Sequence, residues 1–346
     1  MRELAKYSFA NAKIRAMLSY LIEPSELSSL ADTKDIYELC EGLKKTVYRS
    51  LVEQLDLEDY NLKKVEKDLL RQDIAIYRKV HDALSSRREK ALAALLLERY
   101  EVEELKVILR IWHKKAAVPA DDYIIAEEIV RPLPVKKILT AATIEEIILL
   151  LDDTPYKKPL MGARDKFKER GSVFYLESAL DMDYYTRLGK CIDGLSPQDK
   201  KIARRILGVA VDIENINWLI RLRKYYALGM GEMLEGVLPG GTWVTKDKVR
   251  EFYASDGLAK VVESVALGPY AGLKNLVEDN VLLIENFLYD FLSREIKKAL
   301  SGFPFTIGTV IGYLFLKHQE TRNIISLFNA KRFGLKKSEF EPLLNA

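Results

Sequence analysis

The sequence predicts an all-α protein made of three similar helical subdomains. Two observations lead to this prediction. Apolar residues recur with helical spacing along most of the 346-residue chain, and two short markers recur at intervals of 106 to 114 residues. Sustained alternation of apolar and polar residues, which is typical of half-buried strands, is absent from the sequence. The repeat interval exceeds that of common two-helix repeats, so each unit must contain several helices.

The helical periodicity is clearest in three segments that each present one apolar face. One segment carries Val102, Leu105, Ile108, Leu109 and Trp112. The others carry Ile144, Ile147, Ile148 and Leu151, and then Ile213, Ile216, Leu219 and Ile220. Spacings of three and four residues place these side chains on one side of a helix. Each segment is therefore expected to be a helix packed against a core.

Two helix starts can be predicted from capping residues. Thr143 and Glu146 form the pattern of a capping box, in which a hydroxyl and a carboxylate bind the first free amides. Ser196 precedes Pro197, and proline is favoured at the first position of a helix. Pro and Gly clusters near residues 119, 155 and 240 are expected to be loops.

The repeat rests on a glutamate marker and a tyrosine marker. The pattern Glu-x-x-(Lys/Asn)-apolar-apolar begins at Glu103, Glu214 and, more loosely, Glu320, with spacings of 111 and 106 residues. The tyrosines are Tyr48, Tyr156 and Tyr270, spaced by 108 and 114 residues. We therefore predict helical repeats over residues 1–118, 119–233 and 234–346, which pack together because no low-complexity linker separates them.

Composition excludes several classes of protein. The 54 basic and 51 acidic residues leave a net charge of +3, so no basic excess indicates a nucleic-acid partner. Two cysteines, Cys40 and Cys191, indicate no disulfide framework and suit a reducing cytoplasm. The N-terminal residues do not resemble a signal peptide. An uncharged run over residues 299–316 is interrupted by Gly302 and Pro304, so it predicts a buried helix rather than a membrane span.

The motifs of common enzymes are missing from the sequence. It contains no phosphate-binding P-loop, no complete Gly-x-Gly-x-x-Gly and no Gly-x-Ser-x-Gly. His81, His113 and His318 stand alone, and neither cysteine belongs to a Cys-x-x-Cys pair, so no metal site is predicted. The sequence thus predicts a non-catalytic protein without a cofactor. An enzyme whose site is assembled from scattered carboxylates is the less favoured alternative.

Polar residues follow the glutamate marker on one side of each predicted helix. The candidate partner-binding residues in these three rows are Glu103, Lys106 and Arg110; Glu214, Asn217 and Arg221; and Glu320 and Asn323. One interpretation is a solvated helix face with ordinary ion pairs. The other is that the three rows face a common central space and bind a helical partner.

The same region resembles a known family. Residues 212–226 resemble the C subunit of archaeal and bacterial V-type (A-type) ATPases, the counterpart of the d subunit of the eukaryotic vacuolar enzyme. Residues 7–17, 96–106 and 303–335 look like the same family, so the resemblance covers essentially the whole chain. Lys106 replaces an asparagine of the pattern in the first copy, and Leu327 replaces an arginine in the third.

The resemblance implies a fold, a function and partners. Such proteins are funnels of three helical subdomains around a pseudo-threefold axis. They are non-catalytic, sit at the cytoplasmic end of a membrane rotor ring of small ion-carrying subunits, and receive the central-stalk subunits in a socket. They couple ATP hydrolysis or synthesis to proton or sodium transport. The alternative is a helical scaffold or adaptor that binds another helical partner.

Overall fold

The computed structural model describes residues 2–58, 61–116, 119, 121, 123–225, 230–253, 268–275, 281–341 and 344. No strand occurs among these residues, which confirms the predicted all-α class. Six long helices form the body: α5 (Leu62–Ala83), α6 (Arg87–Lys114), α10 (Phe174–Asp193), α11 (Pro197–Tyr225), α15 (Val281–Ser301) and α16 (Ile307–Phe333). The N-terminal helix α1 (Arg2–Leu18) packs against α5 and α16.

Shorter helices cover the body. They are α2 (Pro24–Ala31), α3 (Ile36–Leu43), α4 (Arg49–Val52), α7 (Val135–Thr140), α8 (Ile144–Leu150), α9 (Lys157–Arg170), α12 (Met230–Gly236), α13 (Lys246–Tyr253), the 3₁₀ segment η2 (Gly268–Asn275) and α17 (Lys337–Phe340). Helix α3 packs on α16, α7 on α6, α9 on α10, α12 on α11, and η2 on α15.

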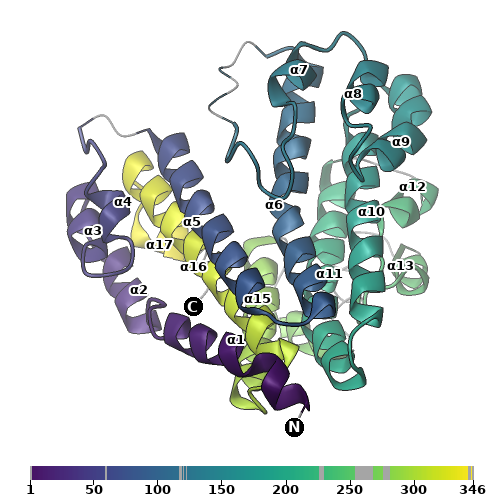
Figure 1. Ribbon diagram of the computed structural model, residues 1–346. Helices are drawn as coiled ribbons and strands as arrows, with labels where there is room; N and C mark the ends of the chain where they lie inside the picture. Colours follow the sequence, from purple (N-terminus) through teal and green to yellow (C-terminus); the bar gives the residue numbers. More distant parts are fainter. Residues whose placement is uncertain are drawn as a thin grey trace.

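The six long helices pack in a series that closes on itself, and α11 also packs directly on α16 across the series. Helix α5 packs on α6, α6 on α10, α10 on α11, α11 on α15, and α15 on α16. Helix α16 then returns to α5, so the first and last parts of the chain lie side by side. In Figure 1 the long helices lie close together at the lower end, near the start of α1, and diverge towards the upper end.

The helix starts follow the predicted capping chemistry. Thr143 Oγ1 accepts the amide of Glu146 at 3.4 Å, and the Glu146 carboxylate accepts the amide of Ala142 at 2.8 Å. The Thr143 half of the predicted capping box is therefore present at the start of α8, whereas the Glu146 carboxylate binds the amide before the cap instead of that of Thr143. Asp35 caps α3 in the same way by accepting the amides of Tyr37 and Glu38.

The predicted buried helix of the uncharged run is also present. This run spans the end of α15, a short connection and the first turns of α16. A Cβ atom on Gly312 would lie 3.1 Å from the Leu300 side chain and 3.2 Å from that of Ile296, so the glycine allows α15 and α16 to approach closely. In the described part of the chain, no helix combines the length and apolar character of a membrane span.

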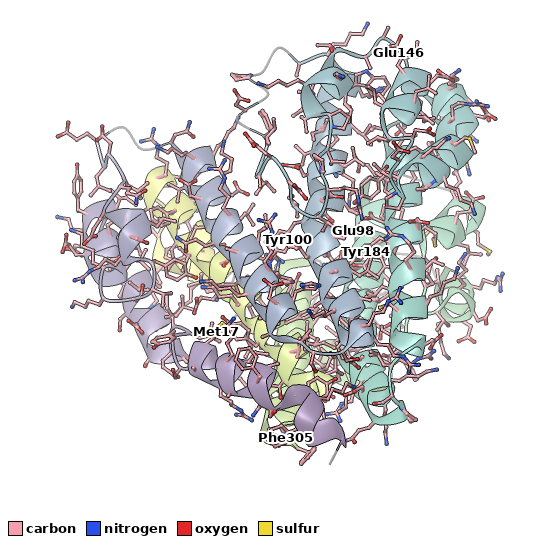
Figure 2. All side chains as sticks on the ribbon, viewed as in Figure 1. Met17, Glu98, Tyr100, Glu146, Tyr184 and Phe305 are labelled. Atoms are coloured by element: carbon pink, nitrogen blue, oxygen red, sulfur yellow. The ribbon has the colours of Figure 1, made fainter. Side chains whose placement is uncertain are left out.

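Hydrogen bonds centred on Asp199 hold together the end of the body that lies lower in Figure 1. Asp199, near the start of α11, is 1% exposed in its side chain and accepts hydrogen bonds from Lys6 and Tyr7 of α1, both at 2.9 Å. It also accepts the amide of Ile307, the first residue of α16, at 2.8 Å. Lys6 continues to Glu89 of α6 at 2.6 Å. The starts of three long helices are thus linked through α1. Phe305 marks this end in Figure 2, whereas Glu146 marks the opposite end.

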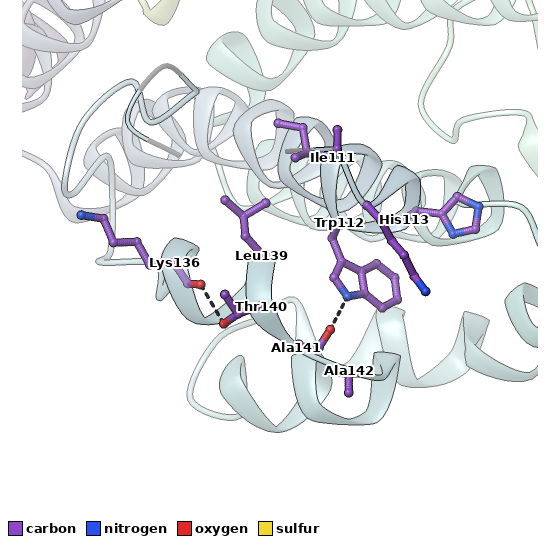
Figure 3. A pocket seen from close by; sticks show the side chains of 10 residues that line it. Ile111, Trp112, His113, Lys136, Leu139, Thr140, Ala141 and Ala142 are labelled. Carbon is purple, nitrogen blue, oxygen red and sulfur yellow. Dashed lines mark hydrogen bonds between the residues drawn. The ribbon is translucent and has the colours of Figure 1, made fainter. Parts of the chain in front are cut away.

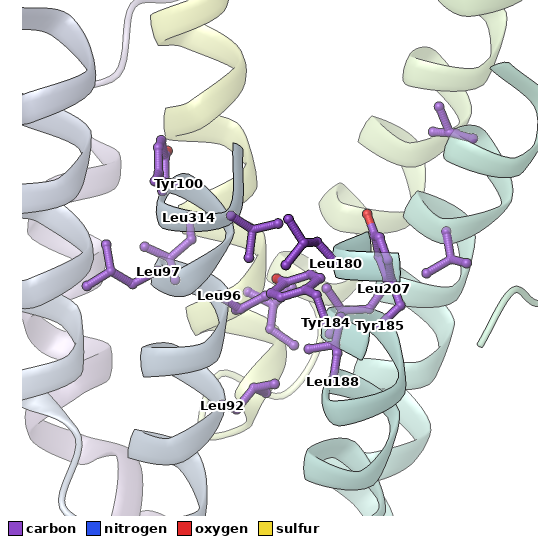
Figure 4. Packing of buried hydrophobic residues seen from close by; sticks show 14 of the residues in the cluster. Leu92, Leu96, Leu97, Tyr100, Leu180, Tyr184, Tyr185, Leu188, Leu207 and Leu314 are labelled. Atoms are coloured by element: carbon purple, nitrogen blue, oxygen red, sulfur yellow. The ribbon is translucent and has the colours of Figure 1, made fainter. Parts of the chain in front are cut away.

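One large core joins all parts of the body. Figure 4 shows Leu92 and Leu96 of α6 packed towards Leu180 and Leu188 of α10, with Leu314 of α16 beside them. A second apolar cluster contains Leu39 and Tyr48 from the first short helices together with Phe328 of α16. Because this cluster joins segments from both ends of the chain, burial of its apolar surface stabilises the closure of the circle. The predicted boundaries at residues 118 and 233 stay a prediction.

Candidate functional site

Three buried tyrosines each donate a hydrogen bond to a buried carboxylate, and we call each such pair a latch. The three latches are Tyr48–Glu320, Tyr156–Glu101 and Tyr270–Asp212, with O···O distances of 2.7, 2.6 and 2.8 Å. The tyrosines are at most 1% exposed. Their carboxylate partners lie on α16, α6 and α11, one in each pair of adjacent long helices. The repeated tyrosine marker is therefore a repeated structural anchor.

Each latch also binds the backbone at an equivalent place. The amides of Ile22, Val130 and Val244 donate to the latch carboxylates at 2.5, 2.9 and 2.8 Å. Each of these residues lies 26 positions before the tyrosine of its own latch. Three identical spacings around three equivalent carboxylates show that the repeat extends to individual hydrogen bonds.

The latches differ in how their charge is balanced. Glu101 also accepts a hydrogen bond from Arg131 at 2.6 Å, and Glu320 forms an ion pair with Lys317 at 2.6 Å. No cation contacts Asp212 among the described side chains, and burial raises the pKa of this carboxyl to about 6. Burial also raises the pKa of all three tyrosines, so each hydroxyl stays protonated and donates a hydrogen bond to the carboxylate.

Substituting each latch tyrosine by phenylalanine tests the three latches separately. Tyr48→Phe, Tyr156→Phe and Tyr270→Phe each remove one buried hydrogen bond to a charged acceptor. Each is therefore expected to lower the free energy of unfolding by about 1.5–3 kcal/mol, measured by urea denaturation. Tyr20→Phe is the matched control because Tyr20 is 64% exposed, and it should change nothing measurable. Neutral effects at all three positions would contradict a stabilising role for the latches.

The latch hydrogen bonds show that the glutamate marker misaligns the third repeat with the other two. The sequence markers pair Glu320 with Glu103 and Glu214. In the structure the equivalents of Glu320 are instead Glu101 and Asp212, because these residues hold the other two latch tyrosines. The third copy is therefore displaced by two residues relative to the marker. Acidic residues at 101, 103 and 104 look alike in sequence, and only their hydrogen-bond partners distinguish them.

The first predicted polar row joins α6 to α10. Lys106 is nearly buried, and its Nζ atom lies 3.0 Å from both carboxylate oxygens of Asp181 and 3.1 Å from Glu103. Arg110 is exposed and makes two parallel hydrogen bonds to Glu177 of α10, at 2.6 and 2.9 Å. Burial raises the pKa of Asp181 to about 6, while the Lys106 charge acts in the opposite direction.

The second row contributes one clear interhelical ion pair. Glu214 of α11 lies 2.7 Å from Arg99 of α6, and Arg99 also donates to the hydroxyl of Tyr185. Asn217 is 9% exposed, and its Oδ1 atom has no hydrogen-bond partner among the described residues. The side chain of Arg221 lies outside the described residues. The two rows together place Arg99, Glu103, Lys106, Asp181 and Glu214 where α6, α10 and α11 meet, and we call these five residues the charged cluster.

The third row is in the interior. Glu320 and Asn323 are 7% and 3% exposed, and Glu320 is engaged by Tyr48, Lys317 and the amide of Ile22. In this copy the row is therefore covered by other segments of the chain, and the expectation that the three rows face a common central space stays a prediction. The physical reason is closure of the circle: the first segments of the chain cover the side of α16 that an isolated helix would expose to water.

The described residues offer no recognisable catalytic centre. They contain no cluster of three or more possible metal ligands. A pocket of about 730 Å³ lies at the end of α6 beside α7 (Figure 3). It is lined by Trp112, His113, Lys115 and Lys136 among others, but by no carboxylate or thiol. Trp112 donates its indole N–H to the carbonyl of Ala141 at 2.8 Å, which is a structural contact. The charged cluster is consequently the better candidate for a functional surface.

The fold and its polar sites define an all-α scaffold built on a repeated plan. A sequence profile of the family described as "ATP synthase (C/AC39) subunit" matches residues 10–342. The chain belongs to this family, which consists of non-catalytic subunits of rotary, ion-translocating ATPases. This match confirms the family indicated by residues 212–226.

Individual relatives agree with the family match. The chain is similar to the C subunit of the A-type ATP synthase of Pyrococcus abyssi, with 25% identity over 98% of this chain and 90% of the relative. The protein of the same name from a Desulfurococcus strain is 26% identical over 97% and 90% of the two chains. That of Methanocaldococcus jannaschii is 25% identical over 99% and 87%. The similarity therefore extends along nearly the full length of each chain.

Proposed function

We propose that this chain is the central-rotor subunit that couples the central stalk of an A-type ATPase to its membrane rotor ring. In this role it binds central-stalk subunits on one side and a ring of small ion-carrying subunits on the other. It transmits torque for ATP-linked proton or sodium transport. The proposed location is the cytoplasmic side of the membrane, peripheral to it through the complex.

The observation that carries the proposal is the closed circle of six long helices. The long helices are joined at one end through Asp199 and diverge towards the other in Figure 1, an arrangement that supports a socket at the diverging end. The three latches support a pseudo-threefold arrangement, because each fixes an equivalent segment to a long helix. Transmission of torque requires a rigid body, and three buried latches, two of them with a paired cation, supply rigidity.

The charged cluster supports a polar contact with the stalk. Arg99, Glu103 and Glu214 have side chains that are 39%, 46% and 36% exposed, so they are held by ion pairs yet accessible to a partner. Mixed charges of this kind contribute more to the orientation of a docking helix than to its binding affinity. Arg110 extends the cluster along α6 towards the C-terminal end of this helix.

Charge reversal at Arg110 tests the socket. Arg110→Glu replaces the Arg110–Glu177 pair by two like charges, and we expect the stalk to bind at least tenfold more weakly, as measured by biolayer interferometry with purified stalk subunits. The thermal midpoint should change little because Arg110 is exposed. Lys201→Glu is the matched control, since Lys201 is an exposed cation on α11 near its tied end. Equal stalk affinity for both variants would contradict the socket and favour a general adaptor.

A further inference from the structure

Basic residues are concentrated at the end of the body where Asp199 links α1, α11 and α16, and we call this the tied end. The chain segments that form it are 6–15, 79–91, 190–205 and 294–306 (Figure 1). Together they contain 15 Lys and Arg residues but only 5 Asp and Glu residues. Since the whole chain has a net charge of +3, the rest of the molecule is net negative. The protein therefore has one positive end.

Few carboxylates at the tied end are available to neutralise these cations. Glu89, Asp199 and Glu295 are buried and already paired within the body, so only Asp82 and Asp193 are exposed. Seven cations at this end are exposed and form no ion pair with any described residue: Lys79, Arg87, Arg88, Lys190, Lys201, Arg294 and Lys297. Their charges are free to act on an external partner.

An aromatic tip projects from the same end, in the connection between α15 and α16. Phe303 is 53% exposed, and its ring centroid lies 5.5 Å from that of Phe305, which packs against the main core. The Thr306 hydroxyl donates to the Phe303 carbonyl at 3.4 Å, and the Thr309 hydroxyl donates to the carbonyl of Pro304 at 2.8 Å. Phe305 lies at the lower edge of the molecule in Figure 2. The tip is thus held in place while it exposes an apolar ring.

Cations lie next to the tip in the structure as well as in the sequence. Lys297 and Lys298, both exposed, lie in the last turns of α15 just before Phe303. Arg15 of α1 donates to the carbonyl of Leu300 at 2.9 Å, which brings a third cation to the base of the tip. The aromatic ring and the positive charges therefore belong to one surface.

This combination suits the surface of a bilayer that contains anionic lipids. The free cations are distributed over the ends of separate helices, so one small anion could contact only a few of them. Anionic headgroups cover a wide area and diffuse to each cation, so they need no fixed pairing geometry. An exposed phenylalanine gains by entering the boundary between headgroups and acyl chains. A protein partner would instead require a pocket for the ring and a matching pattern of carboxylates.

We propose that the tied end is a membrane-facing surface that binds anionic lipid headgroups, with Phe303 reaching the headgroup boundary. The proposal rests on the proposed function only for the presence of a membrane beside the assembled complex. The contact with lipid itself needs no other subunit. It orients the protein, because the end at which the long helices diverge then faces away from the membrane and towards the stalk.

Sedimentation of the isolated full-length protein with lipid vesicles tests the surface. The vesicles are phosphatidylcholine alone or phosphatidylcholine with about 30% phosphatidylglycerol, at salt concentrations from about 0.05 to about 0.5 M. Partitioning onto the anionic vesicles should be at least tenfold stronger than onto the neutral ones at low salt, and it should fall at least tenfold at high salt. Equal partitioning onto both vesicles, or none onto either, would overturn the proposal.

Charge reversal at the two ends of the body shows whether position matters. The triple variant Arg88→Glu, Lys201→Glu and Lys297→Glu changes three helix ends at the tied end and should weaken partitioning at least tenfold. The matched control is Lys114→Glu, Lys137→Glu and Lys158→Glu, at exposed cations on α6, α7 and α9 towards the opposite end. It alters the net charge equally and should weaken partitioning less than threefold. Equal losses would mean that net charge alone governs binding, and the proposal would be wrong.

The aromatic tip has a matched pair of its own. Phe303→Ser should weaken partitioning onto anionic vesicles at least threefold, whereas Phe333→Ser should not change it. Phe333 is 69% exposed and lies at the far end of α16. Unchanged thermal midpoints confirm that both variants are folded. If the two variants bind equally, the tip does not enter the bilayer boundary and its role in the proposal is refuted.

Two further outcomes separate this proposal from its neighbours. Arg110→Glu should bind anionic vesicles normally, because Arg110 lies far along α6 from the tied end, so loss of stalk binding and loss of lipid binding are independent results. A protein that binds the stalk but not the vesicles would refute only the lipid surface. Capture of soluble polyglutamate without retention on vesicles would identify an acidic protein as the partner and would also refute it.

Discussion

Replacing Lys317 by methionine is expected to lower the free energy of unfolding by about 3–5 kcal/mol, measured by urea denaturation. Lys317 is 3% exposed, pairs with Glu320 at 2.6 Å, and lies over the ring of Tyr48 at 4.4 Å. Methionine keeps most of the apolar stem but leaves the carboxylate of Glu320 buried without its cation. The loss should be large because this latch joins segments 272 residues apart and closes the circle of helices.

Two further variants distinguish the effect of an unpaired buried charge from the effect of losing side-chain packing. Lys317→Met combined with Glu320→Gln removes both charges, and it should recover most of the lost stability because a neutral pair has no uncompensated charge. Lys44→Met removes an equally spaced but exposed ion pair with Glu41 and should not shift the transition. If the single and double variants were equally unstable, packing rather than charge would explain the effect.

Asp199→Ala should produce a similarly large loss, also about 3–5 kcal/mol. The substitution removes the carboxylate that accepts hydrogen bonds from the Tyr7 hydroxyl and the buried Ile307 amide, and it removes a carboxylate that pairs with Lys6. Because these donors belong to α1 and α16, the tied end of the body should loosen. Denaturation gives the free energy, and hydrogen exchange at the starts of α11 and α16 locates the loosening.

Matched variants at the same end test this interpretation. Asp199→Asn retains an acceptor for the Ile307 amide and should be less destabilising than Asp199→Ala. Asp193→Ala removes an exposed carboxylate that pairs with Lys200 and Arg204, and it should leave the transition unchanged. Equal stability of Asp199→Ala and Asp193→Ala would show that the junction does not hold the helices together.

The stability of the protein should also depend on pH in a direction that follows from its buried carboxyls. Burial raises the pKa of Asp181 and Asp212 to about 6 and that of Glu104 to about 7. Groups whose pKa is raised on folding bind more protons in the folded state than in the unfolded state. Their contribution to the free energy of unfolding therefore falls as pH increases from about 4 to 7.

The helical class, several helix starts and the family could be predicted from the amino-acid sequence alone. Helical spacing along α6 and α11 reflects a burial pattern that does not depend on which partner covers the face. The cap of α8 by the Thr143 hydroxyl is a local hydrogen bond, so this helix start could be predicted without tertiary information. The recurrence of Tyr48, Tyr156 and Tyr270 was also visible, because each position must supply the same buried hydroxyl.

Tertiary contacts were needed to tell which residues meet and which stay accessible. Spacing alone cannot distinguish Glu101 from Glu103, and the difference appears only when Tyr156 and Arg131 are seen to bind the former. Glu320 and Asn323 are buried because the first segments of the chain close over α16, a contact between residues nearly 300 positions apart. Local sequence encodes the faces of a helix, but the identity of the surface that covers each face depends on how the whole chain closes on itself.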